Sequence, residues 1–158
     1  MFSKKISEKD CTNQIAQAIV DIVDESVEDE SHPLYEVVDR KGQLLLLLHM
    51  HYMALRATQQ EYLISGLFSH VVNIEYQPDN KENAIELVEK VNEQIEELYE
   101  NSFDDDDRLD LVLLSTKFAL VHVDDDIVSQ MIVLNYINGV CPEIFESMGE
   151  IKANVEIV

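Results

Sequence analysis

The amino-acid sequence predicts a single α+β domain with an antiparallel sheet. Two long segments carry the three-and-four spacing of apolar residues that is typical of amphipathic helices, whereas several shorter runs are rich in β-branched and aromatic residues. The chain contains 17 Val and 14 Ile but only seven Ala, and this balance favours strands in the shorter runs. We therefore expect the element order α, β, β, β, α, β, β, α across residues 1–158.

The first predicted helix spans residues 7–28. Ser7 and Asp10 resemble a capping box, in which the serine side chain accepts a hydrogen bond from the backbone of the first turn. Apolar residues follow from Ile15 to Val27 at steps of three and four, and we expect the helix to end before Pro33.

A second helix is predicted over residues 80–100, with Asp79 or Asn80 as its cap. One side of it is apolar and the other is crowded with glutamate. A short last helix is expected to begin at Pro142, since proline is well accommodated in the first turn of a helix.

The strands are expected near residues 34–39, 43–54, 61–76, 111–123 and 127–136. Asp39 and Gly42 fit a hairpin turn between the first two strands. An all-α helical bundle is the alternative fold class. Residues 109–123 also satisfy a helical period, and four Gly with three Pro are few for a sheet protein, so the sequence leaves both interpretations open.

The composition predicts a folded and very acidic protein. Eleven Lys and Arg stand against 32 Asp and Glu, which gives a net charge of −21, while 46% of the residues are hydrophobic. A field of that sign repels phosphate backbones and anionic lipids, so we expect no direct binding of nucleic acid and no membrane attachment. A basic protein is the expected partner.

The chain shows no apolar leader and no apolar run of about 18 residues, so a cytoplasmic location is expected. Cys11 and Cys141 fit neither a disulfide framework nor a metal-binding spacing, and we expect two reduced thiols. Residues 41–74 hold a single acidic residue, Glu61, and we expect this stretch to form the interior.

No catalytic residues, no cofactor and no metal site are predicted. The sequence contains no phosphate-binding glycine motif and no nucleophile motif, so we expect that the protein is not an enzyme. His49 and His51 would share a face only on a strand, because two residues on a helix point about 200° apart, and ordinary core histidines are favoured over a zinc site.

Acidic residues on the second helix and after it form the candidate partner-binding surface. Several of them recur at steps of three or four, so that their carboxylates share one side of a helix, where like charges oppose helix formation slightly. The full predicted set is Glu82, Glu86, Glu89, Glu93, Glu96, Glu97, Glu100, Asp104, Asp105, Asp106 and Asp107. An ordinary solvated helix face is the simpler explanation of the same pattern.

Residues 80–148 resemble the type III secretion chaperones and the related YbjN-like sensory-transduction-regulator family. The resemblance rests on NAIELVEKVNEQI in a helix, then KFALVHVDDD, then NGVCPEIFESM at the start of a last helix. It implies an α+β homodimer that binds polypeptides and has no catalytic activity. Residues 43–70 depart from the family pattern, because they are rich in Leu and poor in turn residues.

Two functions follow from these observations. The first is a chaperone-like or adaptor-like protein-binding module that acts as a dimer on a basic or partly unfolded protein. The alternative is an acidic DNA mimic that inhibits a DNA-binding enzyme, of the anti-defence type found in phages and mobile elements. Adaptation to high salt would explain the charge without any partner.

Overall fold

The computed structural model shows a helical protein and describes most of the chain. The described residues are 4–76, 89, 92–94, 96–98, 100–103, 105–106, 108, 110, 113–114, 117, 123 and 126–158. Everything said below about structure refers to these residues.

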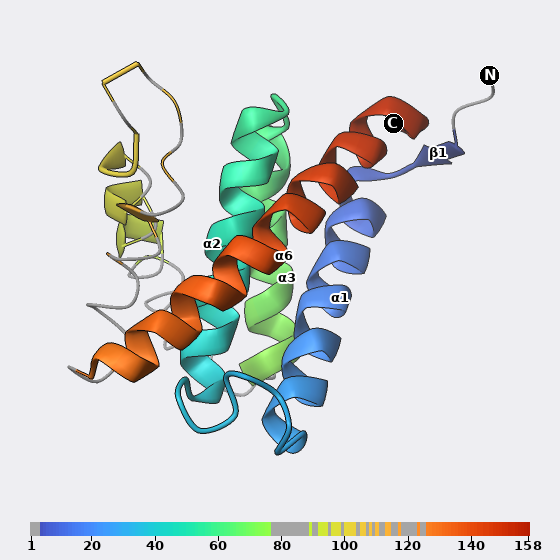
Figure 1. Ribbon diagram of the computed structural model, residues 1–158. Helices are drawn as coiled ribbons and strands as arrows, with labels where there is room; N and C mark the ends of the chain where they lie inside the picture. Colours follow the sequence, from blue (N-terminus) through green and yellow to red (C-terminus); the bar gives the residue numbers. More distant parts are fainter. Residues whose placement is uncertain are drawn as a thin grey trace.

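Four long helices build the described fold (Figure 1). They are α1 (Glu8–Glu28), α2 (Arg40–Ala57), α3 (Ile64–Tyr76), which follows the 3₁₀ turn η1 (Glu61–Leu63), and α6 (Ile127–Asn154). α1 packs chiefly on α3, whereas α6 crosses α2 and packs on it. The two strands, β1 (Lys4–Ile6) and β2 (Val155–Ile157), pair in parallel and bring the two ends of the chain together.

The predicted antiparallel sheet is wrong, and the all-α alternative fits the described residues better. Residues 34–39 form turns, 43–54 lie in α2, 61–76 form η1 and α3, and 127–136 lie in α6. The predicted strand at 111–123 falls largely outside the described residues.

Burial explains why the sequence of α2 predicts a strand. Thirteen of its 18 residues are buried, and they are distributed on all sides of the helix. A helix that is apolar all round lacks the three-and-four alternation that marks a helix with one solvated face, so its Leu run is equally typical of a buried strand.

The Asp39 and Gly42 pair caps a helix and does not form a hairpin turn. The Asp39 carboxylate accepts a hydrogen bond from the Gly42 backbone N–H at 2.8 Å, which is the geometry of an N-cap. Gly42 therefore sits in the first turn of α2. An aspartate three residues before a glycine fits both a hairpin turn and the first turn of a helix, and the local residues alone do not distinguish these two structures.

The first predicted helix is confirmed, and the last predicted helix is longer than expected. Ser7 Oγ accepts from Asp10 N–H at 3.0 Å and caps α1, which ends at Glu28. α6 does not start at Pro142 but runs through it from Ile127, with Asp126 as its cap. Pro142 is exposed, so the backbone carbonyl that loses its helical partner can reach water.

The core lies between α2 and the other three long helices. Leu46, Met50 and Met53 of α2 are completely buried, together with Ile19 of α1 and Leu67 of α3. Few polar side chains enter this core. The Ser26 hydroxyl donates to Gln43 Oε1 at 2.5 Å, which joins α1 to α2 below the surface.

Arg40 connects three helices at one end of the bundle. Its guanidinium lies 2.6 Å from a carboxylate oxygen of Asp24 on α1, and it donates to both carboxylate oxygens of Glu75 on α3, at 2.6 and 2.9 Å. Arginine suits this position because its fork of donors engages a carboxylate with two parallel hydrogen bonds.

Two glycines in helices give a matched test of the packing. A Cβ at Gly139 meets nothing within 4 Å, so Gly139→Ala is expected to raise the free energy of unfolding by about 1 kcal/mol through helix propensity. A Cβ at Gly42 would lie 2.6 Å from Cγ1 of Val38 and 3.1 Å from the capping oxygen of Asp39. Gly42→Ala is therefore expected to destabilise the protein by about 1 kcal/mol or more. Urea unfolding measures both, and equal effects of the two substitutions would contradict this packing of α2.

Candidate functional site

The described members of the predicted partner-binding set are exposed. Glu89, Glu93, Glu96, Glu97 and Glu100 are all exposed, and each of them has helical backbone. Asp105 and Asp106 are also exposed. Glu82, Glu86, Asp104 and Asp107 lie outside the described residues.

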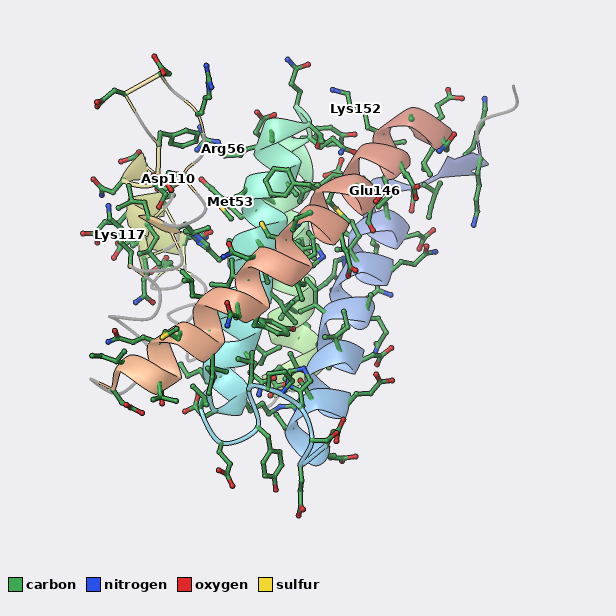
Figure 2. The ribbon with its side chains drawn as sticks, in the orientation of Figure 1. Met53, Arg56, Asp110, Lys117, Glu146 and Lys152 are labelled. Carbon is green, nitrogen blue, oxygen red and sulfur yellow. The ribbon has the colours of Figure 1, made fainter. Side chains whose placement is uncertain are left out.

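This acidic segment contacts the body of the protein through a few side chains. Leu98 is buried in the core cluster, and Asn92 and Glu96 line a small hollow together with Tyr52 and Arg56 of α2. Figure 2 shows Arg56 at the end of α2 nearest to this segment. In Figure 1 the segment lies on the other side of α2 from α1.

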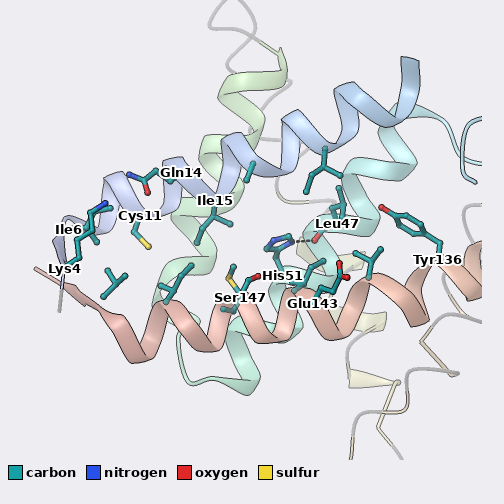
Figure 3. A pocket seen from close by; sticks show the side chains of 17 residues that line it. Lys4, Ile6, Cys11, Gln14, Ile15, Leu47, His51, Tyr136, Glu143 and Ser147 are labelled. Atoms are coloured by element: carbon teal, nitrogen blue, oxygen red, sulfur yellow. Dashed lines mark hydrogen bonds between the residues drawn. The ribbon is translucent and has the colours of Figure 1, made fainter. Parts of the chain in front are cut away.

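A pocket opens between α1 and α6 and was not expected from the sequence (Figure 3). Its volume is about 530 Å³, within the range of small-ligand sites. Lys4 lies at one end and Tyr136 at the other, so the pocket runs along the two helices. We refer to this cavity as the α1/α6 pocket, and its lining residues are Lys4, Ile6, Cys11, Gln14, Ile15, Ala18, Ile22, Leu47, His51, Tyr136, Val140, Glu143, Ile144, Ser147, Met148, Ile151 and Val155.

The pocket results from the way the helices pack. Because α1 packs chiefly on α3 and α6 packs on α2, the facing sides of α1 and α6 stay apart. On α1 the apolar positions Cys11, Ile15, Ala18 and Ile22 step by four, three and four, so they form one wall. Ile22 is 41% exposed, although the sequence pattern groups it with the apolar residues of the helix that face the core.

His51 is the polar group at the centre of the α1/α6 pocket. It belongs to α2, is only 6% exposed, and its ring lies between α1 and α6 (Figure 3). Its Nδ1 is 2.7 Å from the carbonyl oxygen of Leu47, which can only accept a hydrogen bond, so Nδ1 carries the proton. Burial lowers the pKa of His51 to about 4, although the hydrogen bond to Leu47 opposes this shift, and the ring is therefore neutral at pH 7.

The two helices that border the α1/α6 pocket carry an excess of acidic residues, while the charged residues of the lining itself are Lys4 and Glu143. α1 carries six acidic residues against one lysine, and α6 carries three against one lysine. Glu143, Gln14 and Ser147 line the pocket and are exposed, which places polar groups at its mouth. The pocket is thus an apolar cavity between two negatively charged helices.

The two cysteines are buried and not joined to each other. Burial raises the pKa of the Cys11 thiol, and it raises the pKa of Cys141 to about 11. Both groups are accordingly protonated at neutral pH, which is the unreactive form of the side chain.

His49 and His51 do not form a pair. Both lie on α2, where residues two apart point to different sides of the helix, so the strand geometry that a paired metal site needs is not present. Within the described part of the chain, no group of three or more His, Cys, Asp and Glu side chains is placed to hold a metal ion. The same residues contain no helix with the length and apolarity needed to span a membrane.

Comparison of the chain with protein-family models, with curated proteins and with solved structures gives no match. The resemblance to type III secretion chaperones consequently rests on the sequence motifs alone. The α+β fold that it implies is not the fold observed, since the described residues are mainly helical.

The buried His51 makes stability depend on pH. Its pKa in the folded state, about 4, lies below the ordinary value of 6.5, so the unfolded chain binds more protons between these values and stability falls as pH decreases through that window. Between pH 7 and pH 5 this contribution amounts to about 2 kcal/mol.

We expect His51→Leu to remove this contribution from the pH dependence of the free energy of unfolding. Urea unfolding at pH 7, 6 and 5 gives the free energy of unfolding of both proteins. The carboxylates titrate in both, so their contribution cancels when the two values at each pH are subtracted. Cys11, Tyr136, Glu143 and Lys4 are the other titratable groups that line the pocket, and all four remain in the variant. Identical pH dependence in the two proteins would contradict the burial of a neutral imidazole.

Proposed function

We propose that this protein is a non-catalytic, chaperone-like or adaptor-like module that binds a basic segment of a protein partner. The observation that carries the proposal is the α1/α6 pocket, an apolar cavity bounded by two helices with an excess of carboxylates. An amphipathic helix with basic residues beside an apolar stripe complements such a cavity in both shape and charge.

The exposed carboxylates of residues 89–106 have a different part in this proposal. They lie across α2 from α1 and do not line the α1/α6 pocket, so they act through their long-range field on a basic partner while it approaches and not on the segment inside the pocket. Such fields accelerate association and select against acidic competitors more than they hold the complex together. Their effect decays over roughly 8 to 10 Å at moderate salt.

A homodimer remains part of the proposal. At the start of α6 the side chains of Ile127, Val128 and Met131 are 74%, 64% and 57% exposed, and they form the apolar surface that a second copy would cover. Ile127 and Met131 are four residues apart, so they share a side of the helix.

Binding can be tested with a synthetic amphipathic peptide of Leu and Lys, labelled with a fluorophore. We expect saturable binding that weakens as salt is added. Ala18→Phe should weaken it about tenfold, because Ala18 is an exposed residue of the pocket wall and the larger ring fills the cavity. Ala153→Phe makes the same exchange on an exposed position of α6 outside the pocket and should have no effect.

The DNA-mimic alternative predicts other results. A mimic would bind a DNA-binding enzyme through its carboxylates, would be displaced from that enzyme by duplex DNA, and would lose inhibition when Glu89, Glu93 and Glu97 become Gln. Unchanged peptide binding by Ala18→Phe, together with such behaviour toward a purified DNA-binding enzyme, would replace the proposal by its alternative.

Light scattering tests the dimer. We expect a particle of about twice the chain mass of 18.1 kDa, and Met131→Lys should shift it toward the monomer because the charge is placed in the covered apolar surface. Val158→Lys, at a 69% exposed residue elsewhere, is the matched control. A wild-type particle with the mass of one chain at every concentration would exclude the dimer.

A further inference from the structure

The tautomer of His51 determines what it can bind. Its Nδ1 donates to the Leu47 carbonyl, so Nε2 carries a lone pair and no proton and acts as a hydrogen-bond acceptor. The His51 ring is one of the side chains that line the α1/α6 pocket, so this acceptor belongs to the wall of the cavity. A buried acceptor that opens into a cavity selects a ligand with a donor, because a ligand without one leaves the acceptor unpaired.

The surroundings of His51 narrow the ligand further. Ile15, Leu47, Ile144 and Met148 are apolar, buried and line the same cavity, whose charged lining residues are Glu143 and, at one end, Lys4. A carboxylate has no donor for Nε2, and carboxylates and phosphates are both repelled by the net charge of the protein. A free ammonium group could donate, but it would lose its hydration among apolar side chains. The remaining class is a neutral, mostly apolar group with a single N–H or O–H.

An aromatic side chain with a donor fits these conditions best. Trp and Tyr combine a large apolar surface with one N–H or O–H, and they are the residues that most often dominate protein interfaces. The sulfur of Met148 adds a favourable contact for an aromatic ring. With a volume of about 530 Å³, the pocket has room for such a ring and for neighbouring side chains of the same segment.

We propose that the α1/α6 pocket recognises a basic partner by one aromatic anchor, a tryptophan, whose indole N–H donates to His51 Nε2. The inference rests on the proposed function, since it names the residue of the partner that enters the pocket. It assigns to His51 a role in specificity: the ring contacts the anchor directly and discriminates it from apolar side chains without a donor.

Indole and benzothiophene test the hydrogen bond without any partner. The two molecules have similar size and shape, but sulfur replaces the N–H in benzothiophene. We expect titration calorimetry to show that the wild-type protein binds indole about tenfold more tightly than benzothiophene. His51→Leu should abolish this preference while both molecules still bind, and Ala18→Phe should weaken both equally.

The same exchange inside a peptide connects the anchor to the proposed function. Three versions of the basic amphipathic peptide carry Trp, benzothienylalanine or Leu at the central apolar position. The Trp version should bind the wild-type protein about tenfold more tightly than the benzothienylalanine version, and the Leu version should bind more weakly than both because it lacks the ring. With His51→Leu the Trp and benzothienylalanine versions should bind alike.

The outcomes separate the inference from the function on which it rests. Equal binding of the three peptides, each weakened by Ala18→Phe, would overturn the anchor and leave the protein-binding function intact. A preference for indole together with no binding of any basic peptide would overturn the proposed function and show that the pocket takes a free small molecule. Equal affinity of the wild-type protein for indole and benzothiophene would overturn the hydrogen bond to His51 whatever the peptides do.

Discussion

The burial of α2 on all sides is the constraint on which the described structure depends. A helix with 13 buried residues out of 18 has no solvated face, so other helices must surround it. α1, α3 and α6 are therefore obliged to present their apolar sides to α2 or to one another, and their charged sides face outward. The large negative charge of the protein is compatible with a stable fold because it is carried by the elements around α2 and not by α2 itself.

The same arrangement explains why a pocket exists. Helices in contact fill the space between them by interlocking their side chains, but α1 packs chiefly on α3 and α6 packs on α2. Between them lies the flank of α2, and the residues that reach this flank are Leu47 and His51. His51, one of the polar residues of α2, is thereby placed at the centre of the cavity, where its protonation state is fixed by burial and by a backbone carbonyl.

The elements that could be predicted are those with one face in solvent and one face in the core, because their polar and apolar residues then alternate. α1 alternates exposed and buried residues and begins with a side-chain cap, so both its type and its bounds could be read from the sequence. The type of α2 could not be predicted because burial on every side removes the periodicity. In α6 the cause is different: its first turns are rich in β-branched residues, whose side chains favour strands. The carboxylates from Glu89 to Asp106 were expected on the surface, and the described ones are exposed. The α1/α6 pocket was not foreseen because it depends on which helices pair and on the hydrogen bond that orients His51, and neither is a property of a local pattern.

The pairing of β1 with β2 forms one end of the pocket from a short ribbon of two strands, whereas helices form the rest of it. Lys4 pairs with Val155 and Ile6 with Ile157, so the contact joins residues about 150 positions apart through two strands of three residues each. A ribbon this short has little stability of its own, and closing so long a stretch of chain costs conformational entropy. Lys4, Ile6 and Val155 are also pocket residues, so local fraying of the ribbon would open that end of the cavity while the helices stay folded. Amide hydrogens of β1 and β2 should consequently exchange with solvent far sooner than those of α2, and the rate at which the ribbon opens sets an upper limit on how fast an occupant passes through that end.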